Sequence, residues 1–574
     1  SLLRCMSAQL HDTDLISVQE VRSKVEAAHA AWRKYCDFTQ ERIDSIVELV
    51  AAEARRNARR LAELAVEETG YGSAQDKLAK NLLAADVLPR AMRGLKTVGV
   101  LREDAEQKIV EIGVPVGVVA AILPTTNPTS TAIYKTLIAL KSGNGIVLSP
   151  HPRSKRCTCE TAALLQRAAL NAGAPEGLVQ CVFNSTIEGT TALLKHPRTA
   201  VILSTGGSGI VRAAYSSGKP AFGVGPGNVP VLIDSSADVD DAVAKVLAGK
   251  SFDFGTVCSS EQCIVAEQRL RGPIVAALKA RQAFLCDAKQ TAALAKLLLT
   301  RDFTVNPECV GQAAPKIAHM AGFDVPEDTP ALVVEIQGVG KQHPLSAEKL
   351  SPVLSLYFAA DFRAALDACE ALLRFGGLGH TAVIHANDDN RIREFALRTP
   401  AFRILANTSA PQGSTGITTN VFPAMTLGCG AVAGNSTSDN IGPLHLINIK
   451  RLAYMTRKAE EAFENPEMLQ AGSAPDRDAI VAAVERYLAK RNFEAKRTQP
   501  KAPETPPEPA PTAPPVEVVD FVCESDVRAA VSESKKIYIG PATIVTPSAR
   551  DLSLYNDVLV MTDQKKVLKK AASE

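Results

Sequence analysis

Short apolar segments alternate with amphipathic helical segments over most of the chain, and this alternation constrains the fold more than any other feature. GIVLSP, LVQCVF, TAVILSTGG and VPVLIDSS are nearly continuously apolar, as strands buried on both faces are. CETAALLQRAALNAGAP, between two of them, has apolar residues three or four apart, which indicates a helix. Strands separated by helices pair in parallel through right-handed crossovers. We therefore expect a doubly wound α/β sheet that binds a nucleotide at its strand ends.

The same alternation resumes after Ser251 in RGPIVAALKARQAFLC, PVLSLYFAA, TAVIHA and FRILAN. This second series predicts a second α/β domain. The expected architecture is a Rossmann-like domain over residues 1–255, a second domain over residues 256–429, and a cleft between them. Clefts between domains are common ligand sites.

The last hundred residues differ in composition from the rest. Residues 474–495 predict an amphipathic helix with one apolar stripe, made of Ile480, Val481, Val484, Tyr487 and Leu488. Residues 496–515 are rich in proline and predict an extended linker. Residues 516–574 form a tail with a short helix and strand-like runs. A helix of this kind either packs on its own enzyme or docks into a groove of a partner.

Charge and cysteine content exclude several classes of function. The chain has 64 basic and 62 acidic residues, so no strong field is available to attract nucleic acid or an anionic membrane. No apolar run reaches the roughly eighteen residues of a spanning helix, and the first residues lack a secretory signal, so we expect a cytoplasmic protein. The twelve cysteines include no CxxC pair and are expected to be reduced thiols, without a metal site.

Cys258, in SFDFGTVCSSEQCIVAE, follows a glycine-containing turn. A thiol presented there could act as a nucleophile if a helix end, backbone amides or a cation raised its thiolate fraction. For an arbitrary cysteine of this chain, a buried structural role is the more common outcome. The local context favours the nucleophile.

Two other turns end apolar strands. Asn127, in AILPTTNPTSTAIYK, is placed either to donate a hydrogen bond to an oxyanion or to cap the following helix. Ser204, Thr205, Gly206 and Gly207 lie between a predicted strand and a helix, where backbone N–H groups can bind a pyrophosphate. This turn lacks the full GxGxxG pattern and is a weak signal by itself.

Eight segments between residues 17 and 450 carry a family resemblance: ETGYG (68–72), PTTNPTST (124–131), SPHPRS (149–154), GVGPGNVPVLID (223–234), FGTVCSSEQ (254–262), EKLSPVL (348–354), GGLGHTAVIH (376–385) and LGCGAVAGNSTSDNIGPLHLINIK (427–450). In this order they resemble the CoA-acylating branch of the aldehyde dehydrogenase superfamily, which includes acetaldehyde and propionaldehyde dehydrogenases of bacteria. The resemblance implies an NAD-dependent, reversible oxidation of a short aldehyde to an acyl-CoA through a cysteine thioester. It also implies a dimer or tetramer formed by a flap near residues 98–112 and 430–455, with 430–473 as the oligomerisation segment.

The resemblance assigns roles residue by residue. Cys258 is the nucleophile, and Asn127 with the Cys258 backbone amide forms the oxyanion hole. Glu348 and the turn at 204–207 contact NAD. On the cofactor side we also place Thr125, Ser149, His151 and Arg153, although many relatives have a lysine where this chain has Ser149. His380, in GGLGHT, is a candidate for proton transfer or a structural histidine.

A departure from the hydrolytic branch decides the acyl acceptor. Hydrolytic relatives carry a glutamate that activates water in the stretch matching Phe222 to Pro230, which here reads FGVGPGNVP. Without that base, the thioester is expected to wait for the thiol of CoA. The alternatives are a hydrolytic enzyme that makes free acid and a non-catalytic protein bound to a shell.

The carboxyl-terminal region also resembles parts of known proteins. The helix at 474–495 is similar to encapsulation peptides that carry enzymes into bacterial microcompartments, and KKIYIGPATIVTPSARDL is similar to tails of shell and cargo proteins. The resemblance implies a shell protein as partner and a location inside a microcompartment of the bacterial cytoplasm.

Overall fold

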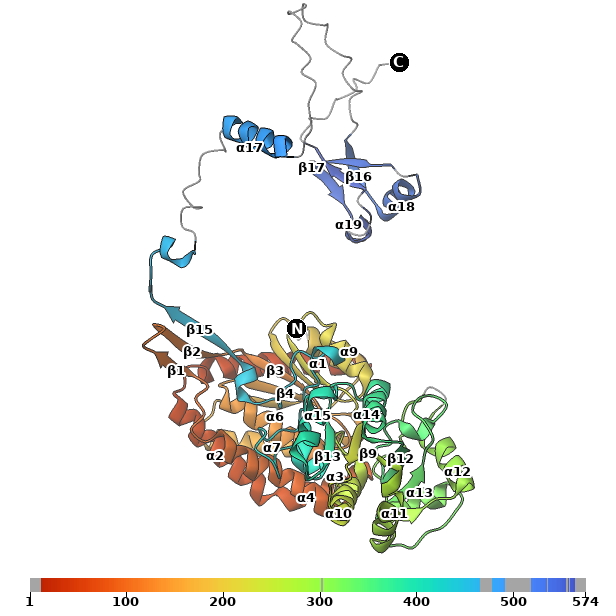
Figure 1. Cartoon of the computed structure of the whole chain (residues 1–574). Coiled ribbons are helices and arrows are strands. Elements are labelled where there is room, and N and C mark those ends of the chain that lie inside the picture. The colour runs from red at the N-terminus through yellow and green to blue at the C-terminus, as the bar shows by residue number, and fades with distance from the viewer. Residues whose placement is uncertain are drawn as a thin grey trace, which may run out of the picture. The chain divides into compact units, whose positions relative to one another are not determined.

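The computed structural model describes residues 12–300, 303–464, 477–490, 518–533, 535–553, 556 and 558–562. The chain divides into two compact units, Ser1–Phe463 and Glu464–Glu574, drawn in Figure 1. The first unit carries the two predicted sheets and the second carries the tail.

The first sheet has five parallel strands in the order β5-β4-β3-β6-β7. The strands are β3 (Val118–Ile122), β4 (Gly145–Ser149), β5 (Val179–Cys181), β6 (Thr199–Thr205) and β7 (Ala221–Val224). Their crossover helices are α6 (Pro128–Lys141), α7 (Lys155–Asn171), α8 (Ile187–Lys195) and α9 (Ser208–Tyr215). The chain leaves β3 toward β4 on one side and returns to β6 on the other. Such a reversal of strand order leaves a crevice at the carboxyl ends of the two central strands, where doubly wound folds bind ligands.

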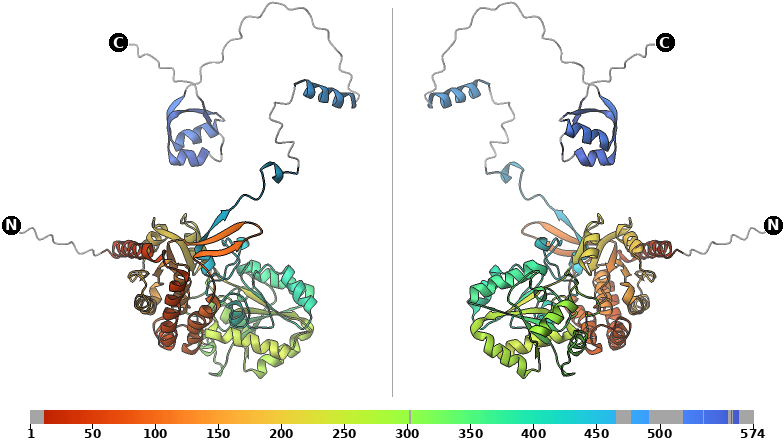
Figure 2. Two further views of the ribbon diagram at one scale, coloured as in Figure 1. Left: turned by 90° about the vertical axis from the view of Figure 1, so that its left-hand side faces the viewer. Right: turned by 90° about the vertical axis from the view of Figure 1, so that its right-hand side faces the viewer.

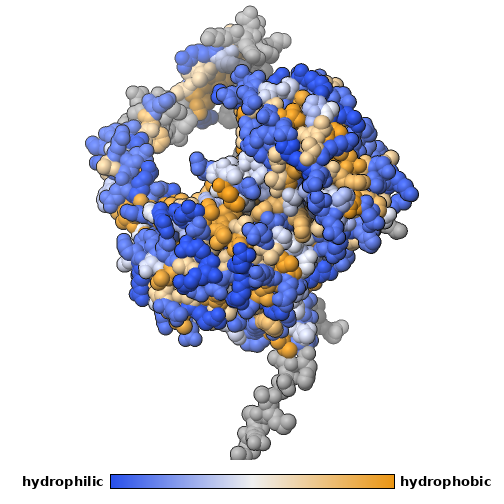
Figure 3. All heavy atoms as spheres, turned by 90° about the horizontal axis from the view of Figure 1, so that it is seen from below, coloured by the Kyte–Doolittle hydropathy of each residue, from blue (hydrophilic) through white to orange (hydrophobic). Residues whose placement is uncertain are grey.

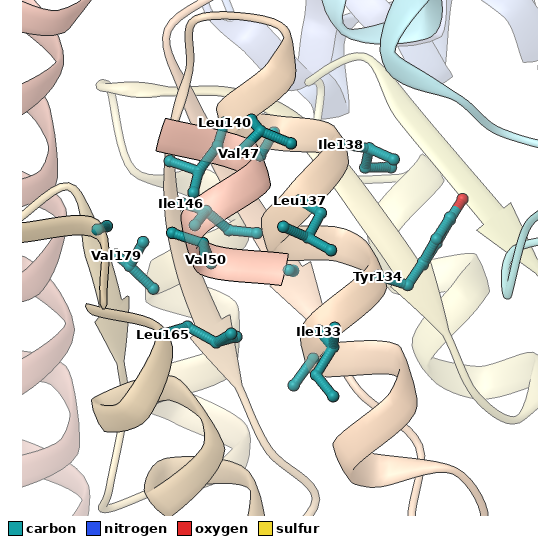
Figure 4. Close-up of a cluster of buried hydrophobic side chains, with 14 of the residues drawn as sticks. Val47, Val50, Ile133, Tyr134, Leu137, Ile138, Leu140, Ile146, Leu165 and Val179 are labelled. Atoms are coloured by element: carbon teal, nitrogen blue, oxygen red, sulfur yellow. The ribbon is translucent and has the colours of Figure 1, made fainter. Parts of the chain in front are cut away.

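Amino-terminal helices cover this sheet. They are α1 (Thr13–Tyr35), α2 (Gln40–Arg56), α3 (Ala58–Thr69) and α4 (Ala74–Leu82), followed by the π-helical turn Leu83–Val87 and α5 (Leu88–Met92). Asp12, Thr39 and Ser73 cap α1, α2 and α4 by accepting backbone N–H bonds. Figure 4 shows Val47 and Val50 of α2 among side chains of α6, β4, α7 and β5. Each fully buried side chain of this size contributes about 1.5–3 kcal/mol.

The second sheet has seven parallel strands in the order β10-β11-β12-β9-β8-β13-β14. They are β8 (Val229–Ile233), β9 (Glu261–Glu267), β10 (Phe284–Leu285), β11 (Leu332–Glu335), β12 (Val353–Ala359), β13 (Ala382–His385) and β14 (Ile404–Ala406). Its helices are α10 (Val239–Ser251), α11 (Arg271–Ala280), α12 (Ala288–Leu298), α13 (Ala314–Met320), α14 (Phe362–Gly376), α15 (Asp389–Arg398) and α16 (Ala410–Ser414). The expectation of two α/β domains is therefore confirmed. Because β8 and α10 belong to this second sheet domain, it begins before the expected boundary at residue 256.

A small antiparallel sheet joins two distant parts of the sequence. β1 (Gly99–Asp104) and β2 (Ile109–Pro115) form a hairpin, and β15 (Ile447–Ala453) pairs with β2 from Ile447↔Pro115 to Ala453↔Ile109. Figure 2 shows the hairpin beside β15 at the surface of the first unit. Three large apolar side chains of this sheet are exposed: Val100, Ile449 and Leu452.

The second unit contains α17 (Arg477–Lys490) and a small three-stranded parallel sheet. The sheet is formed by β16 (Val519–Val522), β17 (Ile537–Val545) and β18 (Leu559–Met561), with α18 (Glu524–Ser532) and α19 (Pro547–Ser553) packed on it. Val522, Val527, Ala530, Ala549 and Val558 form its core. The expected linker at 496–515 lies outside the described residues.

The exterior matches the balanced charge of the sequence. Figure 3 shows a surface on which hydrophilic residues, in blue, predominate and apolar residues, in orange, form smaller patches. Among the described helices, none is both long and apolar enough to cross a membrane.

Candidate active site

A cavity of about 1310 Å³ lies in the first unit and is lined by loops of both sheet domains. From the first sheet come the loops after β3, β4 and β6; from the second come the turn before β9 and residues near 305 and 348. The cavity therefore includes the crevice at which the strand order of the first sheet reverses. A site here can hold a nucleotide on one wall and reacting groups on the other.

Cys258 lines this cavity and is half-buried. It lies on the turn between α10 and β9. Three residues before it in this turn, Asp253, Phe254 and Gly255, have left-handed backbone conformations, with φ of 48°, 51° and 73°. A side chain at position 255 would lie 2.8 Å from the backbone of Ser351, so only glycine fits this close approach. This turn places Cys258 at the cavity, where the sequence analysis expects the nucleophile.

The surroundings of Cys258 do not by themselves activate it. The pKa of the thiol is raised to about 12, mainly by burial and also by the nearby Glu348 and Cys429, whereas Arg403 opposes this shift. At pH 7 a thiol with that pKa is ionised in about one molecule in 10⁵. A nucleophilic cysteine needs a cation or other donor that lowers its pKa. Arg403 has this effect on Cys258, but the effect is smaller than that of burial.

Asn127 is the residue before α6, at the carboxyl end of β3, and lines the same cavity. Its side chain makes no capping bond to the helix. Instead, Asn127 Nδ2 donates to Thr126 Oγ1 at 3.1 Å, and Asn127 Oδ1 accepts from Lys80 Nζ. Of the two interpretations that the sequence left open, helix capping by the side chain is wrong.

The glycine turn lies between β6 and α9. Thr205, Gly206 and Gly207 line the cavity, with Gly207 as the residue that precedes α9. Ser204 is fully buried inside β6 and does not line the cavity. Since both faces of this parallel strand are covered, the placement of Ser204 among the cofactor-contacting residues is not supported by its position.

Ser149 at the end of β4 lines the cavity, as do His151 and Arg153 in the loop after β4 and Thr125 in the loop after β3. His151 Nδ1 accepts from the Arg153 backbone N at 3.2 Å. The Arg153 guanidinium donates to Tyr71 Oη at 3.4 Å. These four residues, which the sequence analysis placed near the cofactor, therefore lie at the carboxyl ends of the neighbouring strands β3 and β4.

Glu348 lines the cavity and is the only carboxylate among the described residues that do so. Glu348 Oε1 accepts a hydrogen bond from Gly227 N at 3.2 Å, so it touches the stretch in which hydrolytic relatives have a glutamate. Burial raises the pKa of Glu348 to about 8. At neutral pH this group is mostly protonated.

His380 lies just behind Cys258 rather than in the cavity. It is fully buried, and a side chain at Gly227 would lie 3.1 Å from the His380 ring and 2.3 Å from the Cys258 carbonyl oxygen. His380 Nδ1 is 3.0 Å from Thr381 Oγ1, and no described residue hydrogen bonds to Nε2. Burial lowers the pKa of His380 to about 3, so the imidazole is neutral at physiological pH.

Three charged residues that the sequence analysis did not predict lie next to Asn127. Lys77 and Lys80 of α4 both pair with Asp253, and all three side chains are at most 3% exposed. Charged residues on an amphipathic helix are ordinarily solvated, so spacing along α4 gives no indication of burial. The presence of two lysines three residues apart on the same helix is the one signal that the sequence offers.

Comparisons with known proteins agree with this geometry. The model of the aldehyde dehydrogenase family matches residues 6–290. The bifunctional aldehyde-alcohol dehydrogenase of Escherichia coli is 43% identical over 442 residues, which are 76% of this chain and 50% of that protein. The acetylating succinate-semialdehyde dehydrogenase of Clostridium kluyveri is 34% identical over 445 residues, which are 78% of this chain and 97% of that protein.

Solved structures give the same result. An acetylating aldehyde dehydrogenase from Geobacillus thermoglucosidasius has a TM-score of 0.77 and 47% identity, covering 78% of this chain and 99% of that one. A propionaldehyde dehydrogenase from the fucose utilisation microcompartment of Clostridium phytofermentans has a TM-score of 0.69 and 27% identity, covering 76% and 97%. The chain belongs to the aldehyde dehydrogenase family. It spans about half the length of the bifunctional relatives that it matches.

Proposed function

We propose that this protein oxidises a short-chain aldehyde to an acyl-CoA, reversibly, with NAD as hydride acceptor and Cys258 as the residue that carries the acyl group. The observation that carries the proposal is the meeting of Cys258 and Asn127 in one cavity whose only described carboxylate is mostly protonated at neutral pH. Relatives named acetylating and acylating support it.

Cys258 forms the bond to the substrate. Its sulfur adds to the aldehyde carbon, and the carbonyl oxygen becomes an oxyanion. The Asn127 amide and the Cys258 backbone N–H donate to that oxygen. A neutral amide suits this task because it donates without titrating, and loss of one such donor ordinarily lowers the rate by about 10²–10³.

The cavity fits NAD at the end of the first sheet. The N–H groups of Gly206 and Gly207 at the start of α9 suit a pyrophosphate, since a side chain at Gly207 would meet no atom within 4 Å and the backbone is open to a ligand. When bound, NAD accepts the hydride that leaves the substrate carbon and brings a positive nicotinamide ring. Glu348, Thr125, Ser149, His151 and Arg153 are proposed to contact it.

CoA is the proposed acceptor of the acyl group. Loss of hydride from the adduct leaves a thioester on Cys258, and the CoA sulfur displaces the Cys258 sulfur from the acyl carbon. CoA reacts as its thiolate, and the thiol proton passes to solvent. His380, the candidate for this proton from the sequence, is fully buried outside the cavity with its pKa lowered to about 3, so it is not assigned this role. Acetaldehyde and propionaldehyde are the proposed substrates, on the likeness to the propionaldehyde dehydrogenase.

The test is NADH formation by the full chain with aldehydes of two to four carbons, with and without CoA, and with NADP in place of NAD. We expect a rate that requires CoA. Cys258→Ala should abolish it, whereas Cys36→Ala, which changes a half-buried cysteine outside the cavity, should not. An equal rate without CoA would identify a hydrolytic enzyme, and no turnover with any aldehyde would indicate a binding protein.

We further propose that α17 directs the protein to a bacterial microcompartment. Ile480, Val481, Val484 and Leu488 are between 40% and 49% exposed on this helix, which presents an apolar stripe of the kind that suits a shell protein. Removal of residues 474–574 should leave turnover intact and abolish co-sedimentation with shells. Loss of turnover in a folded truncated enzyme would contradict this proposal.

A further inference from the structure

Lys77, Lys80 and Asp253 form a buried charge cluster on the far side of Asn127 from the cavity. Lys77 Nζ lies 3.0 Å from Asp253 Oδ2, and Lys80 Nζ contacts the same oxygen. The Asp253 side chain is fully buried. Buried charges of this kind are expensive to desolvate, so a cluster beside a reactive cavity calls for a function.

Lys80 fixes the direction of the Asn127 amide. Burial lowers the pKa of Lys80 to about 8, whereas Asp253 favours its charged form, so it is mainly an ammonium at neutral pH. An ammonium only donates hydrogen bonds, hence the oxygen of the amide must face Lys80 and the NH₂ must point the other way. One N–H of Asn127 binds Thr126 Oγ1, and the second remains for a ligand.

Lys77 holds the backbone of the same loop. Lys77 Nζ donates to the Thr126 carbonyl oxygen at 2.9 Å. The two lysines of α4 therefore fix both the main chain before Asn127 and the amide itself. Neither lysine lines the cavity.

Asp253 connects the cluster to the nucleophile. Its carboxylate accepts from Ser73 N at 2.8 Å and from Thr256 Oγ1 at 2.6 Å, and its own N–H donates to Asp76 Oδ2 at 2.9 Å. These bonds hold the left-handed residue that begins the turn leading to Cys258. A residue with positive φ and a side chain persists only where its surroundings hold it in place.

We infer that the Lys80–Asp253 pair is a positioning device that aims the N–H of Asn127 at the substrate oxygen and keeps this donor in register with Cys258. Lys80 acts through Asn127 and does not touch the substrate. Its positive charge also polarises the amide and makes the free N–H a stronger donor. This inference rests on the proposed role of Asn127 in the oxyanion hole.

The first test compares Lys80→Met with Asn127→Ala and the double variant in NADH formation with saturating CoA. Lys80→Met should lower kcat by about 100-fold, as the loss of one oxyanion donor does, with a much smaller change in KM for the aldehyde. In the Asn127→Ala background the same substitution should have almost no further effect, because its target is gone. Equal effects of Lys80→Met in both backgrounds would overturn the inference.

Matched variants separate positioning from folding. Lys80→Gln can still donate an N–H to Asn127 Oδ1 and should recover part of kcat. Lys141→Met removes a buried lysine at the other end of α6, where it pairs with Asp44, and should leave kcat unchanged. If Lys80→Met does not fold, Lys80→Gln replaces it in the same experiment. Its effect on kcat is then compared between the wild-type and Asn127→Ala backgrounds, and equal effects would again overturn the inference. A wild-type rate for Lys80→Met, or a loss in Lys141→Met as large as that in Lys80→Met, would contradict the inference.

A second readout does not need turnover. A short aldehyde that adds to Cys258 without NAD should protect the thiol from iodoacetamide. Lys80→Met should require a higher aldehyde concentration for the same protection, while the alkylation rate without aldehyde stays that of the wild type. Absence of NADH formation together with intact, Lys80-dependent protection would reject the proposed function and retain the positioning role. Unchanged protection in Lys80→Met would reject the positioning role.

Discussion

Glu348 Oε1 and Gly227 N are joined by a hydrogen bond of 3.2 Å, which brings a carboxyl group from the second sheet domain against the glycine-rich stretch before β8. The same carboxyl group raises the pKa of Cys258 when it is charged. Burial raises its own pKa to about 8, so its charge appears only above neutral pH. The charge of Glu348 therefore adds to the effect of burial and lowers the thiolate fraction of Cys258 further above neutral pH.

Glu348→Gln is expected to make Cys258 more reactive at high pH. Above pH 8 the wild-type carboxylate disfavours the thiolate, and the amide removes this repulsion, so alkylation by iodoacetamide at pH 9 should rise about threefold to tenfold. At pH 6.5 Glu348 is already protonated and the two proteins should react at similar rates. Mass spectrometry of the Cys258 peptide gives the rates. A slower reaction of the variant at pH 9 would contradict the assigned interaction.

The sequence predicted the two α/β domains and pointed to site candidates at turns. Asn127 and Gly206 lie at turns after buried strands, and Cys258 lies on the turn between α10 and β9, where glycine and polar residues restrict the geometry. Ser204 precedes the same kind of turn but lies inside a strand covered on both faces, which spacing does not reveal.

The features of the site that the sequence did not predict depend on contacts between segments that are far apart in the chain. Lys80 meets Asp253 across 173 positions, and Glu348 meets Gly227 across 121. The pKa of Cys258 likewise follows from packing, since the local sequence gave no reason to expect it to be raised. β8 belongs to the second sheet because it pairs with β9 and β13. The apolar residues of β8 predict a buried strand but do not indicate which strands it pairs with.

Gly227→Ala is expected to disable the site through the backbone of Cys258. The added Cβ would lie 2.3 Å from the Cys258 carbonyl oxygen, so the nucleophile must move. Misplacement by about 1 Å lowers rates by about 100-fold, and overpacking destabilises by about 1–3 kcal/mol. The measurements are NADH formation and the thermal unfolding midpoint.

Gly272→Ala, in α11 and outside the cavity, is the control for that variant. Its Cβ would meet no atom within 4 Å, and its φ is outside the left-handed region. It should keep nearly full activity and stability. Equal activity of the two variants would show that the contact at Gly227 does not constrain Cys258.

The antiparallel sheet of β1, β2 and β15 predicts an effect on subunit assembly. Ile449 and Leu452 are 40% and 45% exposed on an edge strand, which is a surface suited to a second copy of the chain. Ile449→Lys should convert a dimer or tetramer to a smaller species in light scattering. Leu397→Lys, at a residue 82% exposed on α15, should leave the mass unchanged. An unchanged mass of Ile449→Lys would argue against assembly through this sheet.

His380 predicts how stability depends on pH. Its pKa is lowered to about 3 by burial, so the folded protein holds it neutral while the unfolded chain protonates it near its ordinary pKa of about 6.5. Between pH 6.5 and pH 3 the unfolded state then binds more protons than the folded state. The free energy of unfolding therefore falls by about 1.4 kcal/mol for each unit by which the pH is lowered in this range. His380→Asn should have a thermal midpoint that decreases less between pH 7 and 5 than that of the wild type. His319→Asn, at an exposed position, should keep the wild-type slope, and an identical slope for His380→Asn would show that folding does not lower the pKa of His380.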